Sequence, residues 1–403
     1  MEYYLQIIIG LIALVAVVMP MSTNVKAIKF KNVVAAILVM ILFGFILLND
    51  YVAGFFEIIS AGVAKLSSAT AQGTRFVFGS LFEQHPLAFA LNVLPLIIVM
   101  STLSALLWHW RILPLVIKGL SYACEKLFNL GGPISFGAAA NVFVGQVEAP
   151  LFVKPYLSKM SKKELLILMT AGMATVSGSV MIALAGVLEN QFEGINIVQH
   201  FLTASILSIP GAILYAEIMY PSNDITHHIE DAKEEKIYAG SMDAITKGTQ
   251  DGLNIAVNVA AILISILALV SIVDGALNLL IADMSLQKIL GYIFAPICWL
   301  LGVPWSEAPS AAELLGLKLA TNEFVAYIQL GGLDPDLFSD RTKVILLYAL
   351  CGFANFSSVG ILISGIGAMA PERTGDLIDV SVKALVGATL ASCLTGLVAG
   401  LFV

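Results

Sequence analysis

The sequence predicts an all-α integral membrane protein with eight transmembrane helices and two re-entrant helical hairpins. Of its 403 residues, 59% are hydrophobic and only 12% are charged. Several apolar runs approach or exceed the roughly 20 residues that a helix needs to cross about 30 Å of hydrocarbon. Two further segments are too short to cross, and each contains Gly, Pro and a carboxylate within apolar sequence.

The eight predicted spans are the longest apolar runs, and they cover residues 5–20, 33–48, 91–107, 165–188, 201–219, 253–273, 344–370 and 384–403. The first run lacks a basic n-region and a cleavage site, so we expect a retained helix in place of a signal peptide. Lys and Arg gather after the first, third, fifth and seventh runs, and they are scarce around residue 50, at 189–193 and at 274–287. The basic loops are therefore expected in the cytoplasm and both termini outside.

Composition and motifs argue against other classes of protein. The formal net charge is −7 and no basic stripe is present, so nucleic acid is not an expected partner. The four cysteines have no metal or redox spacing, and the pair His227–His228 lies in a charged loop typical of solvated residues. No paired-Asp protease pattern, His-rich metal motif or Ser/His pair occurs at one depth, so no enzyme is expected.

The first short segment, residues 131–160, is predicted to be a re-entrant hairpin with the stretch NVFVGQVEAP at its tip. About a dozen residues separate Pro133 from Gly145, which is roughly 18 Å of helix, or half a bilayer. Lys154 follows soon after Gly145, so the chain must return to the side from which it came. Broken backbone at that depth is tolerated only where it is buried in protein or lines a watery cavity. A second half-helix is expected to begin near Glu148.

The second half of the chain repeats this plan. GMATVSG at 172–178 and GFANFSS at 352–358 share the pattern Gly-x-Ala-(Thr/Asn)-x-Ser, which predicts breaks in the fourth and seventh spans. Inverted repeats with broken helices are typical of secondary transporters that hold their substrate near the midplane. The predicted units are N-terminal scaffold helices at 1–89, a first repeat at 90–219, a cytoplasmic linker at 220–251, and an inverted second repeat at 252–403 with its hairpin at 304–334 and its broken span at 344–370.

Spacing decides which glutamate of the second repeat corresponds to Glu148. Glu148 precedes Thr175 of the first break by 27 positions. Glu323, in the stretch TNEFVAY, precedes Asn355 of the second break by 32 positions, whereas Glu307 precedes it by 48. Glu323 is therefore the predicted partner of Glu148. The second EAP, which begins at Glu307, is predicted to open the second hairpin.

Glu148 and Glu323 are the sharpest signals, because an ionisable group inside a bilayer costs several kcal/mol unless it is hydrated or paired. They either form a site or hold the hairpins shut from within. Four amides have the same two interpretations, since they could line a site or satisfy backbone freed by the breaks: Asn141, Gln146, Asn322 and Asn355. These residues alone predict a polar organic solute whose transport is coupled to a cation.

Four ordered stretches carry a more specific resemblance. AANVFVGQVEAP, GVPWSEA, TNEFVAY and CGFANFSS resemble the hallmark stretches of the concentrative nucleoside transporter family, in its bacterial eight-span form. The resemblance extends over essentially the whole chain. It implies a homotrimer in the cell inner membrane that imports nucleosides by sodium symport, with an elevator-like transport domain that moves against a scaffold.

The resemblance also implies a role for particular residues. Gln146 and Glu148 would bind the nucleobase beside Val147 and Val180. The ribose hydroxyls would be held by Glu323, Asn355 and Ser358, with Phe353 lining the pocket. The sodium ion would bind between the first hairpin and the first break. Its ligands would be the side chains of Asn141 and Thr175 and the carbonyls of Val144 and Val176.

Two departures from the family pattern leave alternatives open. Val147 replaces a Ser or Thr found in many members, which leaves the base preference open. Thr175 replaces a Ser, but its hydroxyl remains available to sodium. Proton-coupled members resemble the family but tend to lack Asn141, so sodium is the favoured coupling ion. The alternatives are a proton-coupled nucleoside symporter in which Glu148 or Glu323 titrates, and a secondary transporter of another polar solute.

Overall fold

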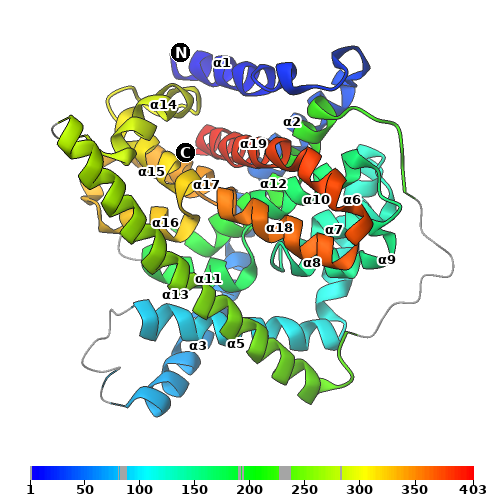
Figure 1. Cartoon of the computed structure of the whole chain (residues 1–403), viewed down its shortest axis with the longest axis vertical. Helices are drawn as coiled ribbons and strands as arrows, with labels where there is room; N and C mark the ends of the chain where they lie inside the picture. The colour runs from blue at the N-terminus through cyan, green and yellow to red at the C-terminus, as the bar shows by residue number, and fades with distance from the viewer. Residues whose placement is uncertain are drawn as a thin grey trace.

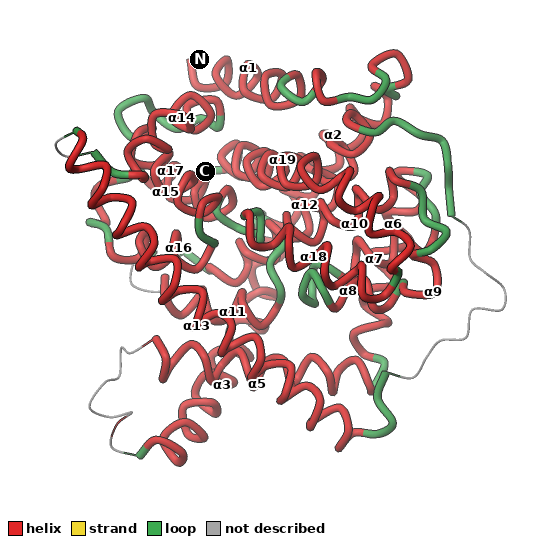
Figure 2. The backbone as a smooth tube through the Cα atoms, in the orientation of Figure 1, coloured by secondary structure: helices red, strands yellow, loops and turns green. Residues whose placement is uncertain are grey.

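A computed structural model describes the whole chain except residues 1, 80, 82–88, 189–191, 193–194, 227–236 and 282–283. The described residues are helices joined by turns and loops, with no strand among them (Figures 1 and 2). The pair His227–His228, most of the expected outer loop at 189–193 and part of the expected linker at 220–251 lie outside the described residues.

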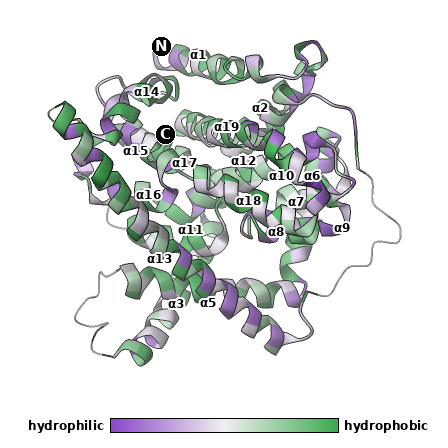
Figure 3. Ribbon diagram, in the orientation of Figure 1, coloured by the Kyte–Doolittle hydropathy of each residue, from purple (hydrophilic) through white to green (hydrophobic). Residues whose placement is uncertain are grey.

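All eight predicted spans coincide with helices. Five stretches of the described chain are by themselves long and apolar enough to cross a membrane: Tyr3–Met21, Phe30–Leu47, Lys162–Leu188, Ile197–Met219 and Pro371–Phe402. Hydrophobic residues cover most of the helices (Figure 3). The elements in these stretches are α1 (Glu2–Ala16), α2 (Phe30–Leu47), α10 (Lys162–Ala174), α11 (Gly178–Leu188), α12 (Ile197–Met219) and α19 (Thr374–Ala399).

The other three predicted spans are long, bent or broken helices. Residues 91–107 lie in α5 (Phe89–His109), which meets α6 (Ile112–Phe128) at a bend of 78° and can be counted with it as a sixth span. Residues 253–273 lie in the 40-residue helix α13 (Ser241–Leu280). Residues 344–370 are divided between α17 (Asp340–Ala349) and α18 (Phe356–Met369), so the predicted break is present.

One long helix was not expected. α3 (Asp50–Phe78) has 29 residues and fills a region where the sequence indicated only a loop around residue 50. Asn49 caps its first turn by accepting a hydrogen bond from the backbone N–H of Tyr51. α3 packs against α5 and α12. Glu57, Lys65 and Arg75 make this stretch too polar for a span, which is why hydropathy did not identify it.

α3, α5 and α13 lie together at one side of the molecule (Figure 1). α5 and α13 pack so closely that two glycines are required between them. A Cβ on Gly248 would lie 2.7 Å from the Cβ of Ala105, and one on Gly252 would lie 2.7 Å from the Cα of Ile98. On the other side, α2 packs against α12 and α19, and α1 packs against α14 (Leu286–Leu300) and α19.

The two hairpins have corresponding elements. The first hairpin contains α7 (Gly132–Ala140), α8 (Glu148–Phe152) and α9 (Lys154–Leu157), and the second contains α15 (Ala308–Ala320) and α16 (Glu323–Gly332). Glu148 is the first residue of α8 and Glu323 the first residue of α16. Glu307 is the residue before α15, so the second EAP opens its hairpin as expected. Each hairpin follows an amphipathic helix, α6 or α14, and precedes a broken span.

An arginine of the second repeat holds the base of the first hairpin. The Nη1 of Arg373 donates to the carbonyl oxygens of Leu157, Ser158 and Met160, at 3.1, 3.0 and 2.6 Å. The carboxylate of Asp376 accepts a hydrogen bond from the Nε of the same guanidinium at 2.8 Å. The last carbonyls of the hairpin, which have no helical partners, are thus bound by a side chain more than 200 residues further along the chain.

The two broken spans touch each other at their breaks. Gly352 has a φ of 96°, and a Cβ added there would lie 2.6 Å from the carbonyl oxygen of Ala174, at the end of α10. Both the backbone conformation and the contact therefore require glycine.

We expect Gly352→Ala to destabilise the protein by at least about 1–3 kcal/mol, the cost of an unfavourable φ alone. Thermal unfolding in detergent measures the change. Gly360→Ala is the matched control, because no atom lies within 4 Å of a Cβ at this position of α18 and Ala favours a helix. Equal melting temperatures for the two variants would contradict the close contact between the breaks.

Candidate substrate and sodium site

The tip of the first hairpin is joined to the first break by backbone. Between α7 and α8 the chain turns without a regular helix, and between α10 and α11 it is broken at residues 175–177. The N–H of Gly178 donates to the carbonyl oxygen of Phe143 at 3.2 Å. The segment that carries Asn141, Val144 and Gln146 therefore lies against the segment that carries Thr175.

Two buried oxygens at this junction have no hydrogen-bond partner among the described residues. Asn141 is 1% exposed, and its Nδ2 donates to the carbonyl oxygen of Gly137 at 3.0 Å while its Oδ1 is unpaired. Gln146 is also buried, and its Oε1 is unpaired. Both side chains lie beside Gly172 in the last turn of α10. An unpaired buried acceptor is costly, so this pair of oxygens suits a cation or a hydrogen-bond donor of a bound solute.

The four predicted sodium ligands lie on the two segments that meet here. Thr175 ends α10, is buried, and donates through Oγ1 to the carbonyl oxygen of Ala171 at 2.9 Å, which leaves its oxygen lone pairs available. Val144 and Val176 are buried backbone positions on either side of the Gly178–Phe143 hydrogen bond. Amide, hydroxyl and carbonyl oxygens are hard ligands of the kind that alkali and alkaline-earth cations prefer.

Glu323, Asn355 and Ser358 form a second buried cluster. The Oε2 of Glu323 accepts a hydrogen bond from the Nδ2 of Asn355 at 3.2 Å. The Oδ1 of Asn355 accepts from the backbone N–H of Ser358 at 2.9 Å and from the hydroxyl of Ser357 at 2.7 Å. Asn355 thus caps α18 and orients Glu323 at the same time. Asn322 caps α16 by accepting a hydrogen bond from the backbone N–H of Val325. Its side chain therefore satisfies backbone freed by the break, which is one of the two interpretations given above.

The remaining predicted substrate residues do not form one cluster with Glu323, Asn355 and Ser358. Val180 is buried in α11, and Phe353 is partly buried against the core beside the second break. Val147 faces α18, where a Cβ on Gly365 would lie 3.1 Å from its Cγ1. Glu148 does not join the Glu323 cluster. It lines a cavity at the hairpin tip, together with Val144 of the hairpin and Ser177 of the first break.

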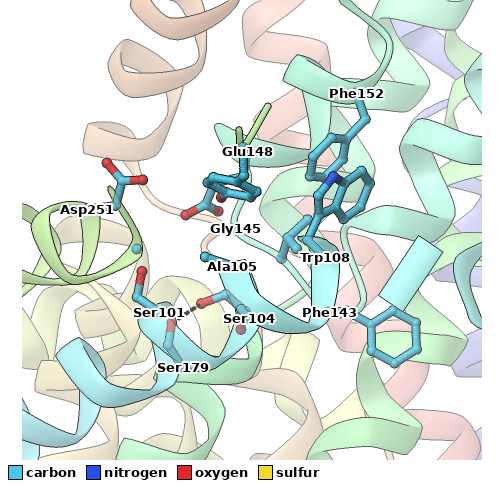
Figure 4. A pocket seen from close by; sticks show the side chains of 14 residues that line it. Ser101, Ser104, Ala105, Trp108, Phe143, Gly145, Glu148, Phe152, Ser179 and Asp251 are labelled. Atoms are coloured by element: carbon cyan, nitrogen blue, oxygen red, sulfur yellow. Dashed lines mark hydrogen bonds between the residues drawn. The ribbon is translucent and has the colours of Figure 1, made fainter. Parts of the chain in front are cut away.

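That cavity lies between the first hairpin and the helices α5 and α13 (Figure 4). Its volume is about 50 Å³, which is room for only a few water molecules. Glu148 and Asp251 both line it, from opposite walls. At its edge, Trp108 stacks on Phe152 with ring centroids 3.5 Å apart. In this conformation the first hairpin is packed against α5 and faces α13 across the cavity, with two carboxylates in one small space.

Sequence reasoning missed Asp251, Trp108 and one further residue, Lys318, which is buried in the second hairpin. Asp251 falls at the end of the expected linker, where a charge needs no explanation. Trp108 follows the end of the third apolar run, where a tryptophan is typical of the membrane interface. Lys318 stands alone in the apolar stretch LLGLKLA, and that isolated charge was the available signal.

Comparisons with known proteins identify the family. A family model described as "Na+ dependent nucleoside transporter C-terminus" matches residues 200–400, its N-terminal counterpart matches residues 9–81, and a model described as "Nucleoside recognition" matches residues 90–191. Together these matches extend over most of the chain. This chain belongs to the concentrative nucleoside transporter family. The family transports its substrates and is not a family of enzymes.

Individual members of the family are similar along their whole length. Nucleoside permease NupC of Helicobacter pylori is 35% identical, over 98% of this chain and 97% of the relative. A protein of Haemophilus influenzae described as an uncharacterised transporter is 37% identical, over 98% and 97%. A solved structure of CNTnw in an inward-facing, substrate-bound state has a TM-score of 0.92 and 34% identity, over 99% of this chain and 98% of that chain.

Proposed function

We propose that this transporter imports nucleosides across the cytoplasmic membrane by sodium symport. The observation that carries the proposal is the unpaired, buried Oδ1 of Asn141 beside the first break, in a chain of this family. The Oε1 of Gln146 is also unpaired, and both side chains lie beside Gly172, so the proposed ion and solute acceptors are close together.

The two clusters suit the two halves of a nucleoside. A carboxylate accepts hydrogen bonds from a pair of hydroxyl groups, so Glu323, oriented by Asn355 and beside Ser358, would bind the ribose. The amide of Gln146 offers both a donor and an acceptor, which suits the polar edge of a base, and Glu148 adds a second acceptor. Val147, Val180 and Phe353 would supply apolar contacts.

Sodium enters this scheme as a co-transported substrate. Its ligands would be the side-chain oxygens of Asn141 and Thr175 and the carbonyl oxygens of Val144 and Val176. Ion binding would fix the hairpin tip against the first break a few residues before Gln146. Since a ligand shifts an equilibrium only through its different affinity for two states, this shared hairpin is the element that couples the ion to the solute.

The sodium gradient supplies enough energy for concentration. One sodium ion that moves inward through about 100 mV releases roughly 2.3 kcal/mol. A tenfold sodium gradient adds about 1.4 kcal/mol. Because about 1.4 kcal/mol corresponds to a factor of ten, the sum supports an accumulation of several hundredfold.

Alternating access would follow the elevator mode, with the two hairpins and two breaks as a moving body. Three observations favour this division. The breaks contact each other at Gly352, the helices α5 and α13 pack closely on each other, and the cavity at Glu148 lies between this pair and the first hairpin. We further propose a homotrimer in the cell inner membrane, with both termini outside and the linker at 220–251 in the cytoplasm.

Uptake of radiolabelled uridine into proteoliposomes, with and without an inward sodium gradient at fixed pH and membrane potential, tests the proposal. We expect accumulation that requires sodium. Accumulation driven only by a proton gradient would establish the proton-coupled alternative. Protein that is folded but takes up neither uridine, adenosine nor cytidine under either gradient would refute nucleoside transport and favour another polar solute.

We expect Asp251→Asn to lower the maximal rate of uptake several-fold with little change in KM. Like charges in one small cavity disfavour each other, so removing one stabilises the conformation in which the first hairpin packs on α13. Asp243→Asn is the control on the same helix. The carboxylate of Asp243 forms an ion pair with the ammonium group of Lys247 at 2.9 Å, and Asp243 does not line the cavity. An unchanged maximal rate in Asp251→Asn would show that the two carboxylates do not influence this step.

A further inference from the structure

Lys318 is a buried cation that the transport scheme above does not use. It lies on α15 of the second hairpin and is 3% exposed. Its Nζ donates to the carbonyl oxygen of Ala349 at 3.1 Å and to that of Cys351 at 3.0 Å. Ala349 is the last residue of α17, so these are carbonyls that the second break leaves without helical partners. A cation is favoured there by the negative end of the helix dipole as well.

Lys318 is one of several side chains that fasten the second hairpin to the second broken span. Among them, Glu307 accepts hydrogen bonds through Oε2 from the backbone N–H and the hydroxyl of Ser339, which caps α17. The hydroxyl of Tyr327, on α16, donates to the carbonyl oxygen of Leu347 at 2.6 Å. Glu323 accepts from Asn355 at 3.2 Å. Lys318 also attracts the carboxylate of Glu323, which follows it by five residues on the same hairpin. The second hairpin is thus fixed to its break by the protein's own groups. Both charged groups, Lys318 and Glu323, belong to the hairpin, and the break contributes neutral carbonyls and the amide of Asn355.

The first hairpin is fixed to its break in a different way. The Gly178–Phe143 backbone hydrogen bond joins them. No hydrogen bond of the described residues runs from a cationic side chain of α7–α9 to the first break, and the Oδ1 of Asn141 is left unpaired there. The corresponding junctions of the two repeats therefore differ in one respect. The second contains a covalently attached ammonium group, and the first contains an acceptor without a donor.

We propose that Lys318 is a positioning residue whose ammonium group acts as a built-in cation for the second hairpin, so that only the first hairpin depends on sodium. This inference rests on the proposed function for the role of Glu323 in binding the solute. Lys318 does not itself touch the solute. It holds the carbonyls of the second break and thereby the relative position of Glu323 and Asn355. One sodium ion per transported solute follows.

Hydrogen–deuterium exchange of the full-length protein, without nucleoside, tests this asymmetry directly. In the wild type, sodium in place of choline should slow exchange in peptides of the first hairpin and leave peptides of the second hairpin unchanged. Lys318→Met should speed exchange in the second hairpin by roughly tenfold or more in both salts, the loss expected for hydrogen bonds from a charged group. Lys318→Arg should largely restore the wild-type rate, because it keeps the cation.

Lys383→Met is the matched control. Lys383 also donates to a backbone carbonyl, that of Met219 at 3.3 Å, but it lies on α19 outside both hairpins. We expect no change in exchange of the second hairpin in this variant. Lys318→Gln serves where Lys318→Met does not fold, since it keeps a hydrogen-bond donor without the charge. The wild-type comparison of the two salts needs no variant.

Uptake assays separate positioning from general stability. Lys318→Gln should raise the KM for uridine by about tenfold or more, as the loss of charged hydrogen bonds requires. The sodium concentration for half-maximal uptake should remain unchanged, with a Hill coefficient near one. Sodium-dependent exchange in the wild-type second hairpin, or wild-type exchange there in Lys318→Met, would overturn the inference. If exchange follows the expectation but no nucleoside is taken up, the proposed function fails and the built-in cation stands.

Discussion

Glu323→Gln should abolish concentrative uptake of uridine while the protein still inserts and folds. The variant keeps the shape of the side chain and an oxygen that can accept from Asn355, which now lies 3.2 Å away. It removes the charge, and each hydrogen bond from a ribose hydroxyl to the charged group is worth about 1.5–3 kcal/mol. Two such bonds predict a loss of transport of roughly a hundredfold or more. Initial rates of uptake in proteoliposomes measure it.

Glu313→Gln is the control for this experiment. Glu313 lies on α15 of the same hairpin, but its side chain faces α14, where a Cβ on Gly291 would lie 2.8 Å from its Cγ. We expect it to transport at close to the wild-type rate. Near-normal uptake by Glu323→Gln would refute the assignment of this carboxylate to the ribose, whatever the control shows.

Asn141→Ser should remove most of the sodium stimulation. The shorter hydroxyl cannot reach the position of the unpaired Oδ1, although it can still donate to the carbonyl oxygen of Gly137. We expect the sodium concentration for half-maximal uptake to rise by roughly tenfold or more, since even indirect ligand changes cost that much at metal sites. Uptake as a function of sodium at constant ionic strength measures the shift.

Asn322→Ser provides the same substitution in the other hairpin. Asn322 caps α16, and Ser caps a helix almost as well as Asn, so sodium dependence should be unaltered. An unchanged sodium response in Asn141→Ser would reject this ion site. Uptake in that variant driven by protons alone would support the proton-coupled alternative.

The sequence was sufficient to predict those features that local patterns determine. Apolar runs gave the spans, and Gly, Pro and the spacing of carboxylates gave the hairpins, because a broken helix at mid-membrane depth needs these residue types. The choice of Glu323 over Glu307 rested on distance along the chain, and both Glu148 and Glu323 do begin half-helices. α3 was missed because Glu57, Lys65 and Arg75 lower its hydropathy below that of a span.

Local sequence patterns could not predict the contacts between segments that are distant along the chain. Asp251 and Glu148 are separated by more than 100 residues, and only the tertiary fold brings α13 and the first hairpin to one cavity. The role of Lys318 could be inferred only after the structure showed that its Nζ donates to two carbonyl oxygens of the second break. The orientation of Glu148 toward this cavity depends on how the first hairpin packs against the rest of the fold, so no residue pattern fixes it.

The guanidinium of Arg373 has a consequence for how the protein is made. Its three carbonyl partners at the base of the first hairpin precede it by 213–216 residues. At the usual speed of synthesis, about 5–20 residues per second, roughly 10–40 s pass between the two ends of these bonds. During that interval the first hairpin has been synthesised, but it lacks the group that closes its base. Its assembly is therefore completed after translation of most of the second repeat, and a chain truncated before residue 373 would leave the base of the first hairpin without its side-chain donor.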